Sequence, residues 1–235
     1  MRRLDVVLLV LASLLGVGCS TVERLNPFGS SGPVVKPNEL VTLQLTADVK
    51  SVWQASVGSA GSNSFSPAIV GESIYAGARD GSLTRFDGGR QVWRIAAGQI
   101  ISGGVGSDGK LVVVGTPKGE VLAFDASNGR ELWKARVSSE VLAAPAIADG
   151  LVVVRSGDAR IFGFDAMDGK RRWVYQRSTP ALALRTSVGV LLAGKFTLAG
   201  FHGGKLVAIA NNNGAAVWEL ALRAVRMRDT IRYFA

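Results

Sequence analysis

Short, almost purely apolar runs alternate with small polar turns through the chain after about residue 46. One complete unit contains the runs Leu111–Thr116 (LVVVGT), Glu120–Asp125 (EVLAFD) and Arg130–Val137 (RELWKARV), and a further strand is expected near Ile101–Gly106. Runs this short and this apolar are typical of strands buried on both faces. The hairpin turns within the units contain Asp-Gly or Asn-Gly, which adopt the positive φ of a tight hairpin at low cost. The pattern predicts four antiparallel strands per unit, and nothing after the N-terminal leader has a sustained helical period.

The unit is repeated along the chain. The segment FDASNGRELW at 124–133 returns as FDAMDGKRRW at 164–173 and, in a shorter form, as FDGGRQVW at 86–93. Successive tryptophans are 40, 40, 40 and 45 residues apart. A period of this length with four short strands per repeat is that of a β-propeller blade. The predicted fold class is therefore all-β, a β-propeller of four-stranded antiparallel blades, with about four blades in residues 46–220.

The repeated letters have structural roles in this interpretation. A tryptophan on the outermost strand of a blade covers the neighbouring blade, where its large ring removes much area from water. An aspartate that opens the turn accepts hydrogen bonds from the backbone amides of that turn. The strand around the first tryptophan precedes the first complete blade, and in a closed ring it would pair with the C-terminal strands. These structural residues are Trp53, Trp93, Trp133, Trp173 and Trp218, with Asp87, Asp125 and Asp165.

The N-terminus has the features of a secretory leader. Two arginines precede the apolar run Val6–Val17, which is shorter than a membrane-spanning helix needs, and the run ends beside Cys19, the only cysteine of the chain. The segment resembles a bacterial lipoprotein signal, which implies a signal peptide at 1–18 and lipid attachment at Cys19; the alternative is a buried free thiol. Ser20 resembles the sorting signal for the outer membrane of a Gram-negative bacterium, on the periplasmic side. The Pro-, Gly- and Ser-bearing stretch 19–45 is expected to be a tether.

Net charge adds little to this picture. The formal charge of +9 would suit a nucleic-acid partner if the basic residues were clustered. They are scattered over the repeats, so no nucleic-acid partner is predicted. The segment 221–235 is rich in arginine and departs from the repeat, which indicates a C-terminally truncated or out-of-frame end; a naturally short variant is the alternative. An incomplete ring of this kind is expected to expose unpaired sheet edges.

The repeat small-Gly-x-hydrophobic-x-x-Phe-Asp-x-x-x-Gly-x-x-x-Trp resembles the PQQ-type blade rather than the WD40 blade. Together with the lipoprotein leader and the tether, it resembles the BamB family, the propeller lipoproteins of the BAM complex, which inserts β-barrel proteins into the outer membrane. The resemblance implies a ring of about eight blades, of which about four are present. It also implies a non-catalytic scaffold that docks the barrel protein BamA and assists unfolded outer-membrane β-barrel clients.

A local motif extends the resemblance. The family has a partner-facing loop of the form Leu-x-Leu-Arg, and ALALRTS supplies the same form here. This implies that Leu182, Leu184 and Arg185 face BamA. The alternative is that the two leucines belong to a strand core and that Arg185 is a solvated surface cation.

The alternative function is that of a fragment of a PQQ-dependent dehydrogenase-like quinoprotein, because those enzymes have the same type of blade. A resemblance to these enzymes would imply a vicinal cysteine pair and a calcium site. This chain has one cysteine, in the leader, so it lacks the cysteine pair. His202, the only histidine, lies in the glycine-rich hairpin GFHGGK. It is interpreted as a turn residue, because no partner His or Cys exists to share a metal with it. The chain is therefore predicted not to be an enzyme and to have no cofactor and no metal.

Overall fold

The computed structural model of the 235-residue chain describes residues 49–177 and 186–222. The chain divides into two compact units, Met1–Lys50 and Ser51–Ala235, and the fold below is that of the second unit. All of its described regular structure is β-strand. Within the described residues, no helix has the length and apolar character required to cross a membrane.

The strands form four antiparallel sheets of four strands, each in chain order. The first sheet contains β1 (Ala68–Val70), β2 (Ser73–Gly77), β3 (Ser82–Asp87) and β4 (Arg90–Ala96). The second sheet contains β5 (Gly106–Ser107), β6 (Leu111–Gly115), β7 (Glu120–Asp125) and β8 (Glu131–Arg136). The third sheet contains β9 (Ala146–Ala148), β10 (Leu151–Arg155), β11 (Ile161–Asp165) and β12 (Arg171–Tyr175). The fourth sheet contains β13 (Leu191–Ala193), β14 (Phe196–Phe201), β15 (Lys205–Ala210) and β16 (Ala216–Ala221).

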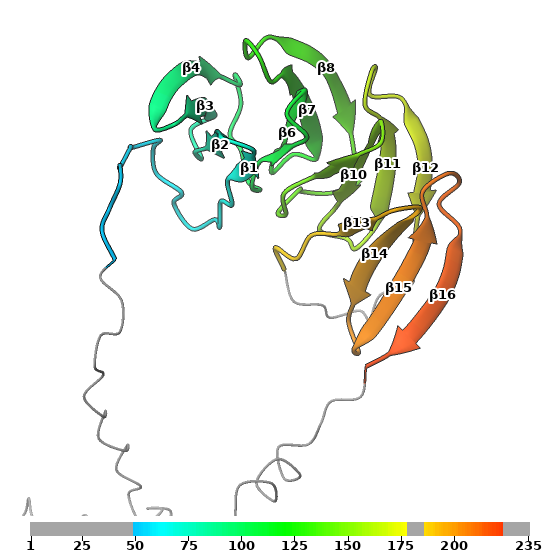
Figure 1. Ribbon diagram of the computed structural model, residues 1–235. Helices are drawn as coiled ribbons and strands as arrows, with labels where there is room; N and C mark the ends of the chain where they lie inside the picture. The colour runs from blue at the N-terminus through cyan, green and yellow to red at the C-terminus, as the bar shows by residue number, and fades with distance from the viewer. Residues whose placement is uncertain (1–48, 178–185, 223–235) are drawn as a thin grey trace, which may run out of the picture. The chain divides into compact units, whose positions relative to one another are not determined.

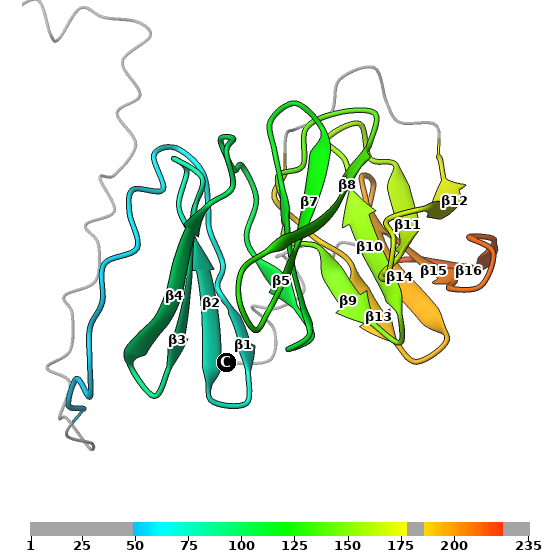
Figure 2. The same ribbon diagram turned by 90° about the horizontal axis from the view of Figure 1, so that it is seen from above.

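The four sheets stand side by side in chain order (Figures 1 and 2). Their innermost strands β1, β5, β9 and β13 are successive neighbours, while β4, β8, β12 and β16 are the outermost strands. This is the arrangement of propeller blades, in which each sheet packs face to face on the next. The predicted all-β fold of four-stranded antiparallel blades is confirmed.

The apolar core lies between consecutive sheets. Three buried clusters are present, one between the first and second sheets, one between the second and third, and one between the third and fourth. All five residues of β6 are buried, and so are the four central residues of β7. Each of these strands sends alternate side chains into the clusters on its two sides, which explains why their sequences are apolar without alternation.

The innermost strand of the second sheet is shorter than predicted. A strand was expected over Ile101–Gly106, but β5 contains only Gly106 and Ser107. The connection to it runs close to the backbone of the next sheet, because a Cβ atom on Gly106 would lie 2.1 Å from the carbonyl oxygen of Pro145. Such close backbone approach is possible only for glycine. Close packing of β5 on the neighbouring innermost strand therefore replaces a longer hydrogen-bonded pairing of β5 with β6.

The strand predicted around Trp53 is absent from the described residues. Residues 49–60 have no regular secondary structure. The Trp53 ring instead lies 5.8 Å, centroid to centroid, from the ring of Phe86 in β3, and it packs on Gly89 in the turn between β3 and β4. Val57 of the same segment accepts a hydrogen bond from Arg94 at 2.8 Å. The segment is thus held by side-chain contacts with the first sheet rather than by strand pairing.

Candidate functional site

The predicted partner-facing residues Leu182, Leu184 and Arg185 lie outside the described residues, and so does Cys19. The segment with the Leu-x-Leu-Arg motif belongs to the connection 176–190, between β12 and β13. It therefore leads from the outermost strand of the third sheet to the innermost strand of the fourth. The equivalent connections, 97–105 and 137–145, are shorter and fully described. The motif is in the one connection of these three that departs from the common length.

A polar hollow of about 290 Å³ adjoins the described end of this connection. Ser102 Oγ donates a 2.6 Å hydrogen bond to the carbonyl of Val141, which ties the two shorter connections together. Thr186, which follows Arg185 in the chain, is part of the same lining. The hollow is lined by Ser62, Asn63, Ser64, Ser102, Leu142, Thr186 and Ser187. Its hydroxyl and amide groups can exchange hydrogen bonds with a partner's backbone, which is the chemistry of a docking surface.

The repeated tryptophans join one sheet to the next. The indole Nε1 atoms of Trp93, Trp133 and Trp173 donate hydrogen bonds of 3.0, 2.9 and 2.7 Å to backbone carbonyls in the turn between the third and fourth strands of the following sheet. The acceptors are the carbonyl oxygens of Ala126, Ala166 and Asn211. Each ring is therefore both an apolar cover and a polar link, which makes the scaffold a continuous stack.

Each of these three tryptophan rings packs against a glycine of the next sheet, and sequence reasoning missed these glycines. A Cβ atom on Gly169 would lie 2.5 Å from the Trp133 ring, and one on Gly214 would lie 2.9 Å from Trp173. Gly129 sits against Trp93 in the same way, with a Cβ distance of 3.4 Å. The signal was present in the sequence, because Gly89, Gly129 and Gly169 each follow a tryptophan by 36 residues.

The first and last tryptophans are more exposed. Trp53 is 42% exposed on the first sheet and Trp218 is 43% exposed on β16. Every residue of β16 is exposed, including Val217 and Leu220. In the part of the chain that the structure describes, no sheet covers this face of the fourth sheet.

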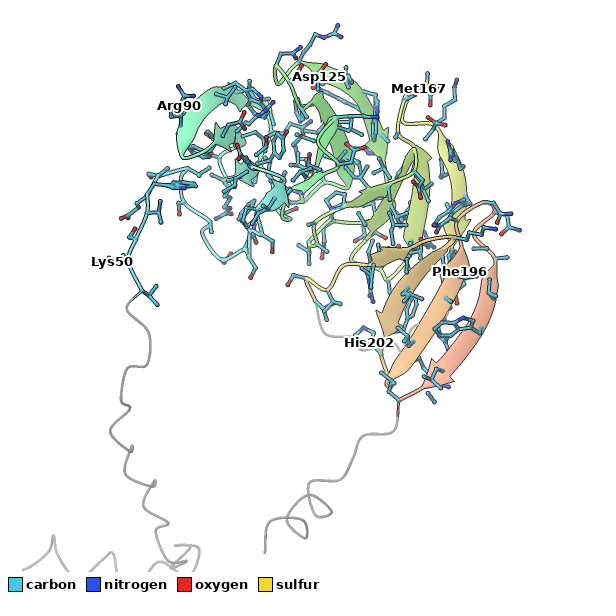
Figure 3. The ribbon with its side chains drawn as sticks, in the orientation of Figure 1. Lys50, Arg90, Asp125, Met167, Phe196 and His202 are labelled. Carbon is cyan, nitrogen blue, oxygen red and sulfur yellow. The ribbon has the colours of Figure 1, made fainter. Side chains whose placement is uncertain are left out.

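The turn aspartates differ among the sheets. Asp125 Oδ1 accepts a 2.8 Å bond from the Ser127 amide, and Asp165 Oδ1 accepts a 2.8 Å bond from the Met167 amide (Figure 3). The Ser127 hydroxyl and amide lower the pKa of Asp125, and Arg172, followed by the Met167 amide, lowers the pKa of Asp165. These carboxylates hold their turns, as the sequence predicts.

Asp87 is held differently. Its carboxylate receives bonds of 2.9 and 2.7 Å from Nε and Nη2 of Arg85, which lowers the pKa of Asp87. Arg85 also donates a 3.0 Å bond to the Ala126 carbonyl in the second sheet. The turn after Asp87 is the shortened one, with Gly88 and Gly89 both at positive φ, so the aspartate binds a neighbouring side chain instead of a turn amide.

His202 lies in the turn between β14 and β15 (Figure 3). Among residues 49–177 and 186–222, no group of three or more His, Cys, Asp and Glu side chains is placed to hold a metal. A hollow of about 620 Å³ lies between the third and fourth sheets, where Arg172, Lys195, Phe196 and Asn211 are part of its lining.

Comparison with known proteins gives the family. The family described as outer membrane protein assembly factor BamB matches residues 79–233. The chain belongs to the BamB family. Its relative in Bordetella pertussis, named outer membrane protein assembly factor BamB, is 44% identical over 213 residues, which are 89% of this chain and 53% of that protein. The chain therefore spans about half the length of the curated relatives it matches.

Solved structures agree with this membership. The crystal structure of BamB from Moraxella catarrhalis has a TM-score of 0.64 and 30% identity, and the match covers 69% of this chain and 50% of that chain. A quinohemoprotein alcohol dehydrogenase from Pseudomonas putida HK5 has a TM-score of 0.58 at 15% identity, covering 72% of this chain and 35% of that chain. The second likeness concerns the fold alone. The BamB family is thus supported by sequence and fold together, and the dehydrogenase by fold only.

Proposed function

We propose that this chain is the propeller-bearing part of a non-catalytic scaffold in the machinery that inserts β-barrel proteins into the outer membrane. The observation that carries the proposal is membership of the BamB family over residues 79–233, on a framework of four sheets joined by repeated tryptophan seals. A stack of this kind is rigid, so it can hold loops at fixed positions for a partner.

The proposed attachment is a lipid on Cys19. The leader ends beside this cysteine and the stretch 19–45 has the composition of a tether. Acyl chains on the mature N-terminus supply membrane affinity without a spanning helix. The propeller would then face the periplasm from the outer membrane.

The proposed partner is BamA, reached through Leu182, Leu184 and Arg185. The motif combines two leucines, which can serve as apolar anchors, with one arginine, a residue type that is enriched at interface hot spots and can donate paired hydrogen bonds. The extra length of the connection 176–190 supports a specialised loop. Unfolded β-barrel clients would be handled by the assembled machinery rather than by a catalytic step in this chain.

The test is co-purification of BamA with the full-length protein that carries Leu182→Ala and Arg185→Glu. We expect loss of BamA from the pull-down, since one variant removes an anchor and the other reverses a charge. The matched control is Leu132→Ala with Arg130→Glu, which makes the same changes at exposed positions around β8 and should leave co-purification intact. Retention of BamA by the first variant, with an unchanged circular-dichroism spectrum, would contradict the proposed docking loop.

The alternative of a quinoprotein fragment is tested separately. Titration of the purified chain with pyrroloquinoline quinone, followed by absorbance, should give no saturable change. A saturable change at micromolar concentrations would favour the alternative, which at present is supported only by the shared fold.

A further inference from the structure

A groove of about 440 Å³ lies between the second and third sheets, and its lining among the described residues includes Gln176 of the connection 176–190. One side is formed by the end of β8 and the residues after it, and the other by the outer strands β11 and β12 of the third sheet. Phe162 and Val174 are partners in register, and Phe162 belongs to the cluster shared with the second sheet. The groove therefore opens over the face of β12 that looks toward β8. Its lining residues are Arg136, Val137, Ser138, Arg160, Phe162, Arg171, Val174 and Gln176.

Three of these lining residues are arginines. Arg160 lies 3.5 Å from Asp158, and this aspartate also accepts a 2.6 Å bond from Ser138 Oγ. Arg136 and Arg171 are exposed. Within the described residues, neither of these two guanidinium groups has an ion pair at 4.0 Å or less. Among the described residues, the one ion pair of a lining arginine is that of Arg160 with Asp158, and Glu120 is the cross-strand neighbour of Arg136. The three arginines outnumber these two carboxylates, so the groove carries an excess of positive charge.

The repeat provides an internal control for these charges. Arg171 is two residues before the tryptophan of its sheet, and Arg160 is thirteen residues before it. The second sheet has Glu131 and Glu120 at the same two positions. The propeller fold therefore does not require arginine at either place. Of the four described sheets, only the third has arginine at both positions.

The fourth sheet shows how the repeat normally balances such a charge. Its residue equivalent to Arg160 is Lys205, whose Nζ lies 3.0 Å from Glu219 Oε1. Glu219 also pairs with Arg177. The position equivalent to Arg171 is Ala216. The groove beside the third sheet differs in that Arg160 pairs with Asp158, while the other two lining arginines, Arg136 and Arg171, have no ion pair among the described residues.

We propose that this groove binds an extended acidic segment of a partner protein, in which an apolar residue lies two positions from each Asp or Glu and so on the same side of the chain. Guanidinium groups bind carboxylates through paired, charge-assisted hydrogen bonds. An extended chain turns alternate side chains to the same side, so its carboxylates reach Arg160 and Arg171 while its backbone runs along the groove. Strand β12 is an edge strand of its sheet, and its free backbone groups can pair with such a chain.

The apolar part of the lining favours a peptide over a membrane surface. Val174 is 38% exposed in the groove, beside the buried side chains of Phe162 and Val137. An anionic lipid headgroup would neutralise the arginines and leave this valine in water. A peptide whose carboxylates and apolar side chains lie on the same side of the extended chain, two residues apart, satisfies both features. The proposal is independent of the proposed function, because it uses no residue of the BamA-facing loop.

The test is fluorescence anisotropy with the full chain and the labelled peptide Glu-Ser-Val-Ser-Glu-Ser-Val-Ser-Glu (the Glu-Val peptide), at physiological salt. Its Glu and Val side chains lie on one side of the extended chain. We expect saturable binding that weakens about tenfold in the variant Arg160→Gln with Arg171→Gln. The control variant Arg130→Gln with Lys134→Gln removes two exposed cations from the second sheet and should bind as the wild type does. Circular dichroism establishes that both variants are folded.

Two further probes make the result decisive. The same peptide with both valines replaced by serine keeps the charge and loses the apolar residues, and it should bind more weakly than the Glu-Val peptide. Equal binding of the two peptides, or equal binding by the arginine variant and the wild type, would overturn the proposal. Binding to phosphatidylglycerol vesicles without binding to the Glu-Val peptide would assign the arginines to a lipid surface instead.

Discussion

Replacement of Trp133 by alanine tests whether the repeated indole holds consecutive sheets together. Trp133 is 7% exposed and belongs to the cluster between the second and third sheets. Its ring lies 6.5 Å, centroid to centroid, from that of Phe164, and its Nε1 donates to the Ala166 carbonyl at 2.9 Å. The variant removes all of these contacts and leaves Gly169 facing a cavity.

The expected cost follows from these contacts. Truncation of a buried tryptophan to alanine lowers the free energy of unfolding by about 3–5 kcal/mol. Trp133→Phe keeps most of the apolar area and loses the hydrogen bond, so we expect a loss of about 1–3 kcal/mol. Trp218→Ala is the matched control, because that indole is 43% exposed. It should lower the free energy of unfolding by no more than about 1 kcal/mol.

Urea unfolding followed by far-ultraviolet circular dichroism measures all three variants, since tryptophan fluorescence itself changes with the substitution. The expected order of destabilisation is Trp133→Ala, then Trp133→Phe, then Trp218→Ala. Equal losses for Trp133→Ala and Trp218→Ala would refute the sealing role. A wild-type midpoint for Trp133→Phe would show that the hydrogen bond to Ala166 contributes nothing measurable.

Three other predictions concern the lipid, a turn glycine and an ion pair. Cys19→Ala should move the protein out of the outer-membrane fraction on cell fractionation, because acyl chains would no longer hold it there; unchanged fractionation would contradict lipidation. Gly169→Ala should destabilise more than Gly150→Ala in urea, because both have φ +71° but only Gly169 has a ring within 4 Å of the added Cβ; equal losses would mean that the backbone conformation alone matters. Hydrogen bonds from Arg177 and Lys205 lower the pKa of Glu219 from 4.5 to about 2. The stability that the Glu219 carboxylate contributes is therefore present above pH 4.5 and is lost as the pH falls toward 2. The melting temperatures of wild type and Glu219→Gln should therefore converge over that range, and a difference that persists at pH 2 would contradict the assignment.

The sequence predicted the repeating parts of the fold because each is determined by local chemistry. The apolar runs of β6 and β7 and the turn letters around Asp125 carry their own strand and hairpin signals. The spacing of the tryptophans located the outermost strands. These features recur in every repeat, so an error in one unit would have been visible against the others.

The departures arise where distant segments meet. The shortness of β5 depends on the approach of Gly106 to the carbonyl of Pro145, a contact between sheets that no local pattern encodes. Trp53 has the spacing of the repeat, yet its segment rests on the first sheet without a pairing strand. Asp87 has the letters of a turn aspartate, but the shortened turn and Arg85 change its partner. The basic groove was present in the sequence only as a difference between repeats, with Arg171 in place of Glu131.

Because every buried cluster joins two consecutive sheets, cooperativity passes along the unit from neighbour to neighbour, as in a one-dimensional array. A sheet with a cluster on each side is held by two couplings, whereas the first and fourth sheets of the described part have one each. Amide protons of the first and fourth sheets should exchange with solvent through local fraying. Amide protons of β6, β7, β10 and β11 should exchange only through rarer, larger openings. Loops attached to the second and third sheets are therefore held by the slowest-exchanging part of the structure. Loops beside the fourth sheet are held by a part that opens locally more often.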